Sequence, residues 1–243
     1  MYSKDEELEL MKEIYSDVDA ELKIIYEEQK NDKEELLKEL ALLLLFYSIV
    51  DNSLSMKKSE STVISVRIYK KVVGFMEKES TNQVKITKNL IDNTLNKLCK
   101  FYNYQLKDIK KVANKAVEGK TYSERIWGNN KEITKYLKKQ VDDFIHGRIS
   151  IEKMRINIEK AFKTSKYNAE RLVEDTISRA RSDMFEEFCK YTGVKKLRRN
   201  EVLDGKTCAD CKNADGDVYD FNDPARPYLP EHVKCRGYYT IEN

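Results

Sequence analysis

Two pairs of residues that commonly bind metals lie near the C-terminal end of the sequence. Cys208 and Cys211 form the first pair, His232 and Cys235 form the second, and twenty residues separate Cys211 from His232. Within each pair two residues lie between the ligands, so both can reach one ion from a tight turn, and the intervening segment returns the second pair to complete a tetrahedron. The spacing predicts a single metal ion held by all four side chains.

The donor set favours zinc in a structural role. Three thiolates and one imidazole in tetrahedral geometry suit Zn2+, whereas iron-sulfur clusters usually take four thiolates. A closed shell leaves no position for a reactive water, so we expect a structural ion rather than a catalytic one. The alternative is a redox pair at Cys208 and Cys211, with His232 on the surface. A metal-dependent nuclease would need further histidines, and the chain has only two. We therefore expect no enzymatic activity.

The other candidate residues carry weaker signals. Cys99 and Cys189 lie in helical patterns with apolar neighbours and are predicted to be small core residues. His146, just before Gly147, is predicted at a helix end. Five cysteines, an odd number, follow an acidic start that is unlike a signal peptide, which favours reduced thiols in a cytosol.

Composition narrows the class of protein. The net charge is +3 from 45 basic and 42 acidic residues, and charged residues make up 36% of the chain. No strong overall field would draw such a chain to nucleic acid or to anionic lipid. The most apolar run, residues 41–50, is much shorter than the roughly 20 residues that span a bilayer, and we interpret it as a buried helix. We expect no membrane association.

Most of the chain must then be helix, because all three prolines fall within residues 224–230. One apolar stripe with spacings of three and four predicts a long amphipathic helix that docks onto another helix, in this chain or in a partner. That stripe consists of Leu8, Met11, Tyr15, Val18, Leu22 and Ile25. Further helix is predicted toward residue 117, with Gly119 as its stop. A second helical group is predicted from residue 121, with a break at Gly147, an N-cap at Ser150, another cap at Thr164 or Ser165, and an end at Gly193.

The predicted fold class is mainly α, an elongated helical bundle with a small C-terminal β-containing zinc-binding module. Short strands are predicted at residues 218–219 and 238–241, after turn dipeptides of aspartate and glycine. The predicted domains are an N-terminal helical region at 1–120, a central helical bundle at 121–193 and the zinc-binding module at 194–243.

Residues 121–243 resemble the Mu F-like family of phage head morphogenesis proteins, the minor head proteins of tailed bacteriophages. The matching elements, in order, are Ser123-Glu124-Arg125-Ile126-Trp127, Gly147-Arg148-Ile149-Ser150, Arg171-Leu172-Val173, Asp204 to Cys211, Asp215-Gly216, and His232 with Cys235-Arg236. Two departures stand out. Glu174-Asp175-Thr176 replaces the family's usual Arg-Thr-Glu, and Gly237 replaces the second cysteine of its usual Cys-Arg-Cys ending. The four predicted ligands remain.

The resemblance implies a structural protein of the virion that is made in the bacterial host cytoplasm. It implies a place in the capsid interior near the portal, a role in head assembly or DNA delivery, and the portal protein as partner, with the major capsid or scaffold protein as further candidates. The alternative is a zinc-ribbon DNA-binding module, suggested by Lys195, Lys196, Arg198 and Arg199 ahead of the cysteines. Residues 190–243 carry ten basic and nine acidic residues, so we expect at most weak contact with packaged DNA.

Overall fold

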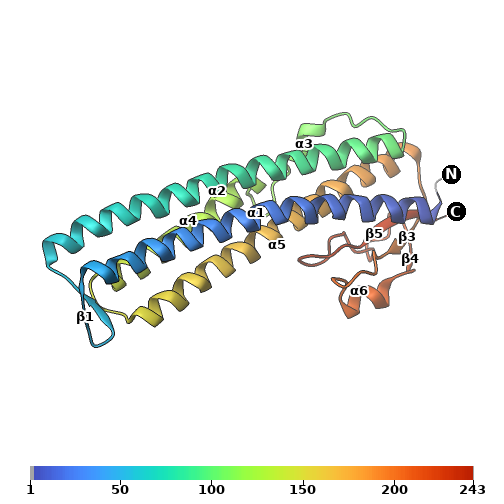
Figure 1. Cartoon of the computed structure of the whole chain (residues 1–243). Helices are drawn as coiled ribbons and strands as arrows, with labels where there is room; N and C mark the ends of the chain where they lie inside the picture. The colour runs from blue at the N-terminus through green and yellow to red at the C-terminus, as the bar shows by residue number, and fades with distance from the viewer. Residues whose placement is uncertain (1–2, 243) are drawn as a thin grey trace. The chain divides into compact units, whose positions relative to one another are not determined.

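Helices dominate the fold, as predicted. The computed structural model describes residues 3–242. The helices are α1 (Lys4–Phe46), α2 (Lys58–Phe101), α3 (Ile109–Ala113), α4 (Tyr122–Ile145), α5 (Ile151–Thr192) and α6 (Ala209–Ala214), shown in Figure 1. Among the described residues, none of these helices has the length and apolar character needed to cross a bilayer.

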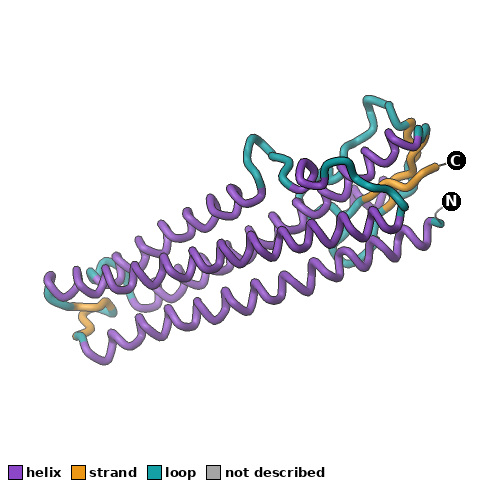
Figure 2. The backbone as a smooth tube through the Cα atoms, turned by 90° about the horizontal axis from the view of Figure 1, so that it is seen from above, coloured by secondary structure: helices purple, strands orange, loops and turns teal. Residues whose placement is uncertain are grey.

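The strands form two small antiparallel sheets (Figure 2). A hairpin of β1 (Ser48–Val50) and β2 (Ser53–Ser55) connects α1 to α2. The second sheet has the order β4-β3-β5, with β3 (Lys196–Asn200) between β4 (Val218–Asp220) and β5 (Tyr238–Glu242). The strands predicted at 218–219 and 238–241 are confirmed. The central strand was missed, because its sequence looks like a basic patch rather than an apolar alternation.

The chain divides into two compact units, each drawn from several segments. The module unit comprises Met1–Glu21, Lys85–Tyr122 and Arg171–Asn243, and the bundle unit comprises Leu22–Val84 and Ser123–Glu170. Helices α1, α2 and α5 each contribute residues to both units. The predicted ranges 1–120, 121–193 and 194–243 do not coincide with these units, and the division into domains stays a prediction.

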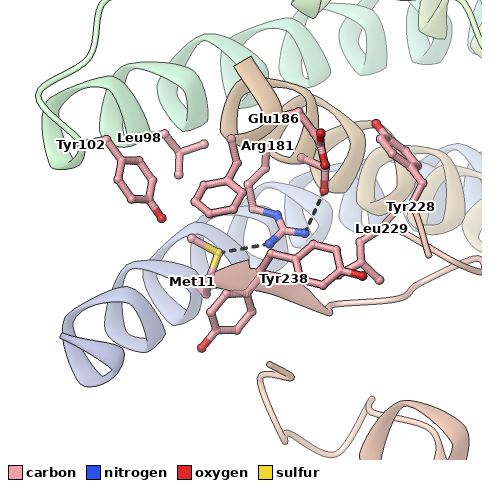
Figure 3. Close-up of a pocket in the computed structure, with 11 residues that line it drawn as sticks. Met11, Leu98, Tyr102, Arg181, Glu186, Tyr228, Leu229 and Tyr238 are labelled. Carbon is pink, nitrogen blue, oxygen red and sulfur yellow. Dashed lines mark hydrogen bonds between the residues drawn. The ribbon is translucent and has the colours of Figure 1, made fainter. Parts of the chain in front are cut away.

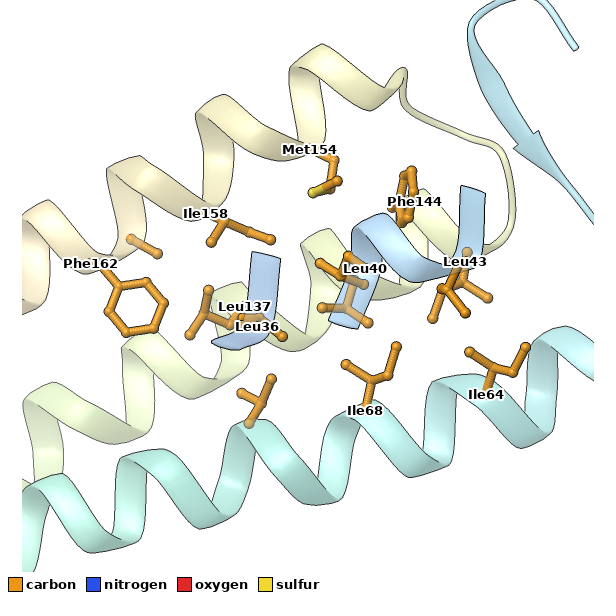
Figure 4. Close-up of a cluster of buried hydrophobic side chains, with 14 of the residues drawn as sticks. Leu36, Leu40, Leu43, Ile64, Ile68, Leu137, Phe144, Met154, Ile158 and Phe162 are labelled. Carbon is orange, nitrogen blue, oxygen red and sulfur yellow. The ribbon is translucent and has the colours of Figure 1, made fainter. Parts of the chain in front are cut away.

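The bundle unit is built from segments of α1, α2, α4 and α5 around an apolar core. Leu36 and Leu40 of α1, Ile68 of α2 and Phe144 of α4 are fully buried there (Figure 4). The remaining buried members of this cluster are Leu43, Leu54, Ile64, Val72, Met76, Ile133, Leu137, Val141, Ile145, Met154, Ile158, Ala161 and Phe162. Side chains from all four helices face one another, as expected of amphipathic helices that share one core.

The turn between α4 and α5 follows the predicted signals. Gly147 has φ +67, and Arg148 N–H donates to the Asp143 carbonyl at 2.7 Å, which closes α4 with a Schellman cap. Ser150 Oγ accepts a hydrogen bond from Lys153 N–H at 3.2 Å and caps α5. The further cap predicted at Thr164 or Ser165 is wrong. Helix α5 continues through both, since their hydroxyls bond to side-chain or carbonyl oxygens within the bundle unit instead.

Two other predictions are corrected by tight turns. The run 41–50 is only in part the buried helix that was predicted. Leu43 is buried in α1, but α1 ends at Phe46, which is 77% exposed, and β1 follows. Asp51 and Asn52 both have positive φ, which gives a two-residue hairpin turn that reverses the chain. Gly119 is likewise not a helix stop, since it lies with Glu118 in a turn closed by the bridge between Val117 and Lys120.

In the module unit, α1 and α5 carry the C-terminal strands. Arg181 of α5 lies between Met11 of α1 and Tyr238 of β5 (Figure 3), with 3.6 Å from Nη1 to the Met11 sulfur and 5.9 Å from the guanidinium to the Tyr238 ring. Tyr15 of α1 is hydrogen-bonded to Ser178 of α5 at 2.8 Å. The predicted stripe on α1 is buried except for half-buried Leu8. It therefore packs within this chain.

Candidate metal centre

Three of the four predicted ligands meet at one point. The ligand atoms of Cys208, Cys211 and His232 all lie within 4.8 Å of one another. His232 Nε2 is 3.0 Å from the Cys211 sulfur and 3.4 Å from the Cys208 sulfur. A tetrahedral zinc ion, with bonds of about 2.3 Å to sulfur and about 2.0 Å to nitrogen, separates its ligand atoms by about 3.5–3.8 Å. The observed spacing is therefore close to that of a metal shell.

The first cysteine pair is shaped by a short helix. Cys208 is the N-cap of α6, and its sulfur accepts a hydrogen bond from Cys211 N–H at 3.5 Å. That bond lowers the pKa of Cys208 below its usual value, since it stabilises the thiolate. Burial and the neighbouring thiols raise the pKa of Cys211. A bound cation would reverse that second effect, because a coordinating thiol loses its proton.

His232 is held in the tautomer that a metal ligand needs. Its Nδ1 lies 2.9 Å from the Val233 carbonyl oxygen. A carbonyl can only accept, so Nδ1 carries the proton and the Nε2 lone pair faces the two sulfurs. The bond to Val233 also raises the pKa of the His232 ring above its usual value. The backbone thus orients the imidazole before any ion binds.

Cys235 adjoins this cluster through Cys211. The two sulfurs are 3.9 Å apart, and a tight turn from the His232 carbonyl to Cys235 N–H at 3.1 Å brings the second pair back. Cys235 belongs to a second group of three ligand atoms, together with Cys211 and Glu201. Cys211 and Cys235 are each 2% exposed, whereas Cys208 and His232 are exposed. The structure thus brings Cys208, Cys211 and His232 together and places Cys235 next to Cys211, which is common to both groups.

Sequence reasoning missed Glu201. Its side chain is fully buried beside the Cys211 and Cys235 sulfurs and is paired with Arg199 at 3.1 Å. Burial raises the pKa of the Glu201 carboxyl. Gly237 makes room for it, since a Cβ at position 237 would lie 2.5 Å from Glu201 Oε1. A single acidic residue just after a short strand gives no sequence signal.

Arg199 was interpreted as part of a basic patch but serves the site. It is 3% exposed, its Nη2 lies 3.6 Å from the Cys211 sulfur, and its Nη1 pairs with Glu231 at 2.7 Å. A guanidinium beside a thiolate partly offsets the negative charge of a three-cysteine shell, as outer-shell partners commonly do. The same residue therefore supports the sulfurs rather than a surface.

A network of charges around the buried Arg236 and Glu174 fixes the ligand-bearing loop, residues 201–237 between β3 and β5, to the helices of the module unit. Arg236, which follows the last cysteine, pairs with Glu174 of α5 at 2.7 Å, with Asp19 of α1 at 3.1 Å and with Asp204 at 2.7 Å. Its guanidinium also lies 4.6 Å from the Tyr15 ring centroid. Glu174 thus anchors the residue after the last cysteine to α5.

The remaining candidates lie outside the site, although the half-buried Cys99 is less enclosed than the predicted core residue. Cys189 is completely buried, and burial raises its pKa to about 12. Cys99 lies in α2 and is half-buried. His146 follows the last residue of α4, with Nδ1 2.9 Å from the Asp142 carbonyl oxygen. No group of metal-ligating residues that the structure describes includes these three.

Comparison of the chain with protein-family models, with curated proteins and with solved structures found no match. Inference about function therefore depends on the donor set and its surroundings. Three sulfurs and one oriented imidazole, two of the sulfurs buried, form a site that can hold a soft divalent cation.

Proposed function

We propose that this chain is a structural minor head protein of a tailed bacteriophage, with one Zn2+ ion bound by Cys208, Cys211, His232 and Cys235. In this proposal it associates with the portal and the capsid interior and acts in head assembly or DNA delivery. The observation that carries the proposal is the cluster of Cys208, Cys211 and His232, with Cys235 beside Cys211, in a region whose motifs resemble the Mu F-like family. Nothing in it depends on catalysis.

The surroundings of the site support a structural ion. The buried Cys211 and Cys235 sulfurs face Arg199 and Glu201, which are both buried, so protein groups rather than solvent surround that half of the shell. A closed four-ligand site of this kind contributes to folding, by about 10 kcal/mol in isolated zinc fingers. The loop between the two ligand pairs has little regular structure of its own, and a bound ion would hold its ends together.

Contacts between the ligand residues and the helices indicate how a bound ion would stabilise the module. Ligation of Cys235 would fix the position of Arg236, and Arg236 pairs with Glu174 and Asp19 on two helices. Ser178 of α5 also donates to the Cys235 carbonyl at 3.1 Å. Zinc would therefore fix the position of the ligand-bearing residues relative to α1 and α5. Such rigidity suits a structural protein of an assembly.

The alternative of a zinc-ribbon DNA-binding module is less well supported. Arg198 forms a bidentate pair with Glu242, at 2.8 Å and 2.6 Å, and Arg199 is buried against Glu201 and Glu231. Both arginines of the suggested basic patch thus form ion pairs within the chain. Of the four basic residues of that patch, Lys195 and Lys196 are the exposed ones. Two lysines would give a weak and strongly salt-dependent contact with DNA.

Elemental analysis tests the metal. We expect one zinc per chain in protein purified without a histidine tag, and a clear loss of zinc in Cys211→Ser, because its sulfur is shared by both groups of ligands. Cys99→Ser is the matched control, since Cys99 lies in α2 and belongs to neither group. Metal-free wild-type protein would refute the site.

Sedimentation tests the partner. The chain is co-expressed with the portal protein encoded in the same genome, and we expect it to co-sediment with portal rings at physiological salt. A DNA-binding module would instead bind DNA with an affinity that falls steeply as salt increases. Sedimentation of the chain alone, in the presence of assembled rings, would contradict the assembly role even if zinc is present.

A further inference from the structure

The bundle unit has an open hollow between α2 and α4, and none of the metal ligands lines it. Its volume is about 450 Å³, within the range typical of ligand sites. Val73 and Met76 of α2 and Trp127 of α4 give it an apolar lining. The two helices run antiparallel here, because Asn130 donates to Ser80 at 2.9 Å while Asp142, farther along α4, accepts from Tyr69, farther back along α2. The hollow is therefore a groove that runs lengthwise between the two helices.

Two neighbouring residues of α4 leave this groove open. Trp127 is the only tryptophan of the sequence and is 44% exposed. Gly128 also lines the groove, and a Cβ there would meet nothing within 4 Å. Glycine inside a helix costs about 1 kcal/mol relative to alanine, and the described neighbours do not require it. A second chain that packs closely against the α4 backbone would require a glycine at this position.

The charge at the groove is mainly positive. Lys131, Lys135 and Lys138 of α4 line it at helical spacings of four and three, and Glu77 of α2 is its acidic residue. Lys135 pairs with the exposed Glu132, and Lys138 lies 5.9 Å from the Tyr69 ring centroid. Ion pairs this exposed contribute little, so the lysines remain able to attract an acidic group from outside.

We propose that this groove binds an amphipathic helix of another protein, one with large apolar residues on one face and aspartate or glutamate along its flank. From Trp127 to Lys138 the lining spans about three helical turns, which matches a helix docked lengthwise between two others. Trp127 would be the central contact, since tryptophan is enriched at the energetic centre of interfaces. The site is independent of the zinc ion and of the function proposed above.

The single tryptophan provides the measurement. The probe is a synthetic peptide of about four helical turns, with leucines on one face and glutamates on its flank. We expect it to shift the Trp127 emission to shorter wavelength in a saturable way when added to the full chain. The matched peptide with lysine in place of glutamate should bind about tenfold more weakly or not at all, since it meets like charges.

Two glycine variants supply the control. Gly128→Leu should fill the groove and abolish the shift, whereas Gly74→Leu should keep it, because Gly74 lies in α2, has equally open surroundings and does not line the groove. Circular dichroism of both variants checks that the helices are intact. An unchanged emission with the acidic peptide, or equal binding by Gly128→Leu, would overturn the proposal. A shift produced by single-stranded DNA and not by the peptide would overturn it in favour of nucleic acid.

Discussion

The bundle unit and the module unit fill their interiors by different means. In the bundle unit, aliphatic side chains and Phe144 from four helices form one continuous core. Both units also bury carboxyl groups, Asp32 and Glu79 of the bundle unit among them, but the buried arginines of the described residues, Arg181, Arg199 and Arg236, all lie in the module unit. Each of these arginines contacts a residue of the C-terminal sheet or of the ligand-bearing loop. The second interior is thus organised around polar contacts and ligands.

The difference indicates how each unit can be disturbed. A substitution in an apolar core lowers stability in proportion to the volume removed, and no metal is involved. Buried charges are costly once a partner is lost, because the remaining charge stays in a medium that solvates it poorly. Three substitutions test whether the two units respond differently to the loss of an apolar side chain and to a change in a buried charge.

The largest effect is expected in the apolar core. Phe144 is completely buried, and Phe144→Ala should lower the free energy of unfolding by about 3–5 kcal/mol through lost burial and a residual cavity. Urea unfolding followed by circular dichroism measures it, with Phe144→Leu as a milder control. The loss should be the same with zinc and with a chelator. A loss that depends on the chelator would mean that the two interiors are not separate.

The next effect is expected at the buried ion network. Arg236→Ala leaves Glu174, which is 1% exposed, without its closest arginine, and breaking a buried pair costs about 3 kcal/mol at the lower end of the usual range. The lower end applies because Lys206 still contacts Glu174 at 3.0 Å. Unfolding measured in zinc should show the full loss, and measurement in chelator should show less, because Arg236 and Cys235 belong to the same loop. Equal losses in both conditions would separate the network from the metal.

The smallest effect concerns a buried carboxyl of the module unit. Burial raises the pKa of Glu7 to about 7, although Tyr102 donates to its carboxylate at 2.9 Å. The folded state therefore binds this proton more tightly than the unfolded state, so wild-type stability falls as pH rises from about 4.5 through 7. Glu7→Gln should be more stable than wild type by about 1–2 kcal/mol above that range and nearly equal below it. Thermal unfolding at pH 5 and pH 8.5 measures this, and a pH-independent difference would contradict it.

Local signals allowed much of the helical fold to be predicted from the sequence. The stripe from Met11 to Ile25, the stop at Gly147 and the cap at Ser150 depend on residues a few positions apart, and all are confirmed. The prediction held only in part for the run 41–50, where Leu43 is buried but Leu45, Phe46 and Val50 are exposed. Hydrophobicity alone does not tell which apolar residues find a partner.

The candidate site shows the same limit. Cys208, Cys211, His232 and Cys235 were identified because ligand spacing is a local pattern, and the structure brings them together. Glu201 and the anchoring role of Arg236 depend on contacts between residues far apart in the chain. Such contacts leave no trace in the spacing of one sequence.

The contact between Gly237 and Glu201 has a consequence for how sequences of this kind can diverge. Any side chain at position 237 would require the buried Glu201 to move, because its first carbon atom would overlap the carboxylate in its present position. A relative with cysteine at the equivalent of Gly237 should therefore carry a much smaller residue at the equivalent of Glu201. The two positions should change in pairs over evolutionary time, each constraining which mutation at the other can survive.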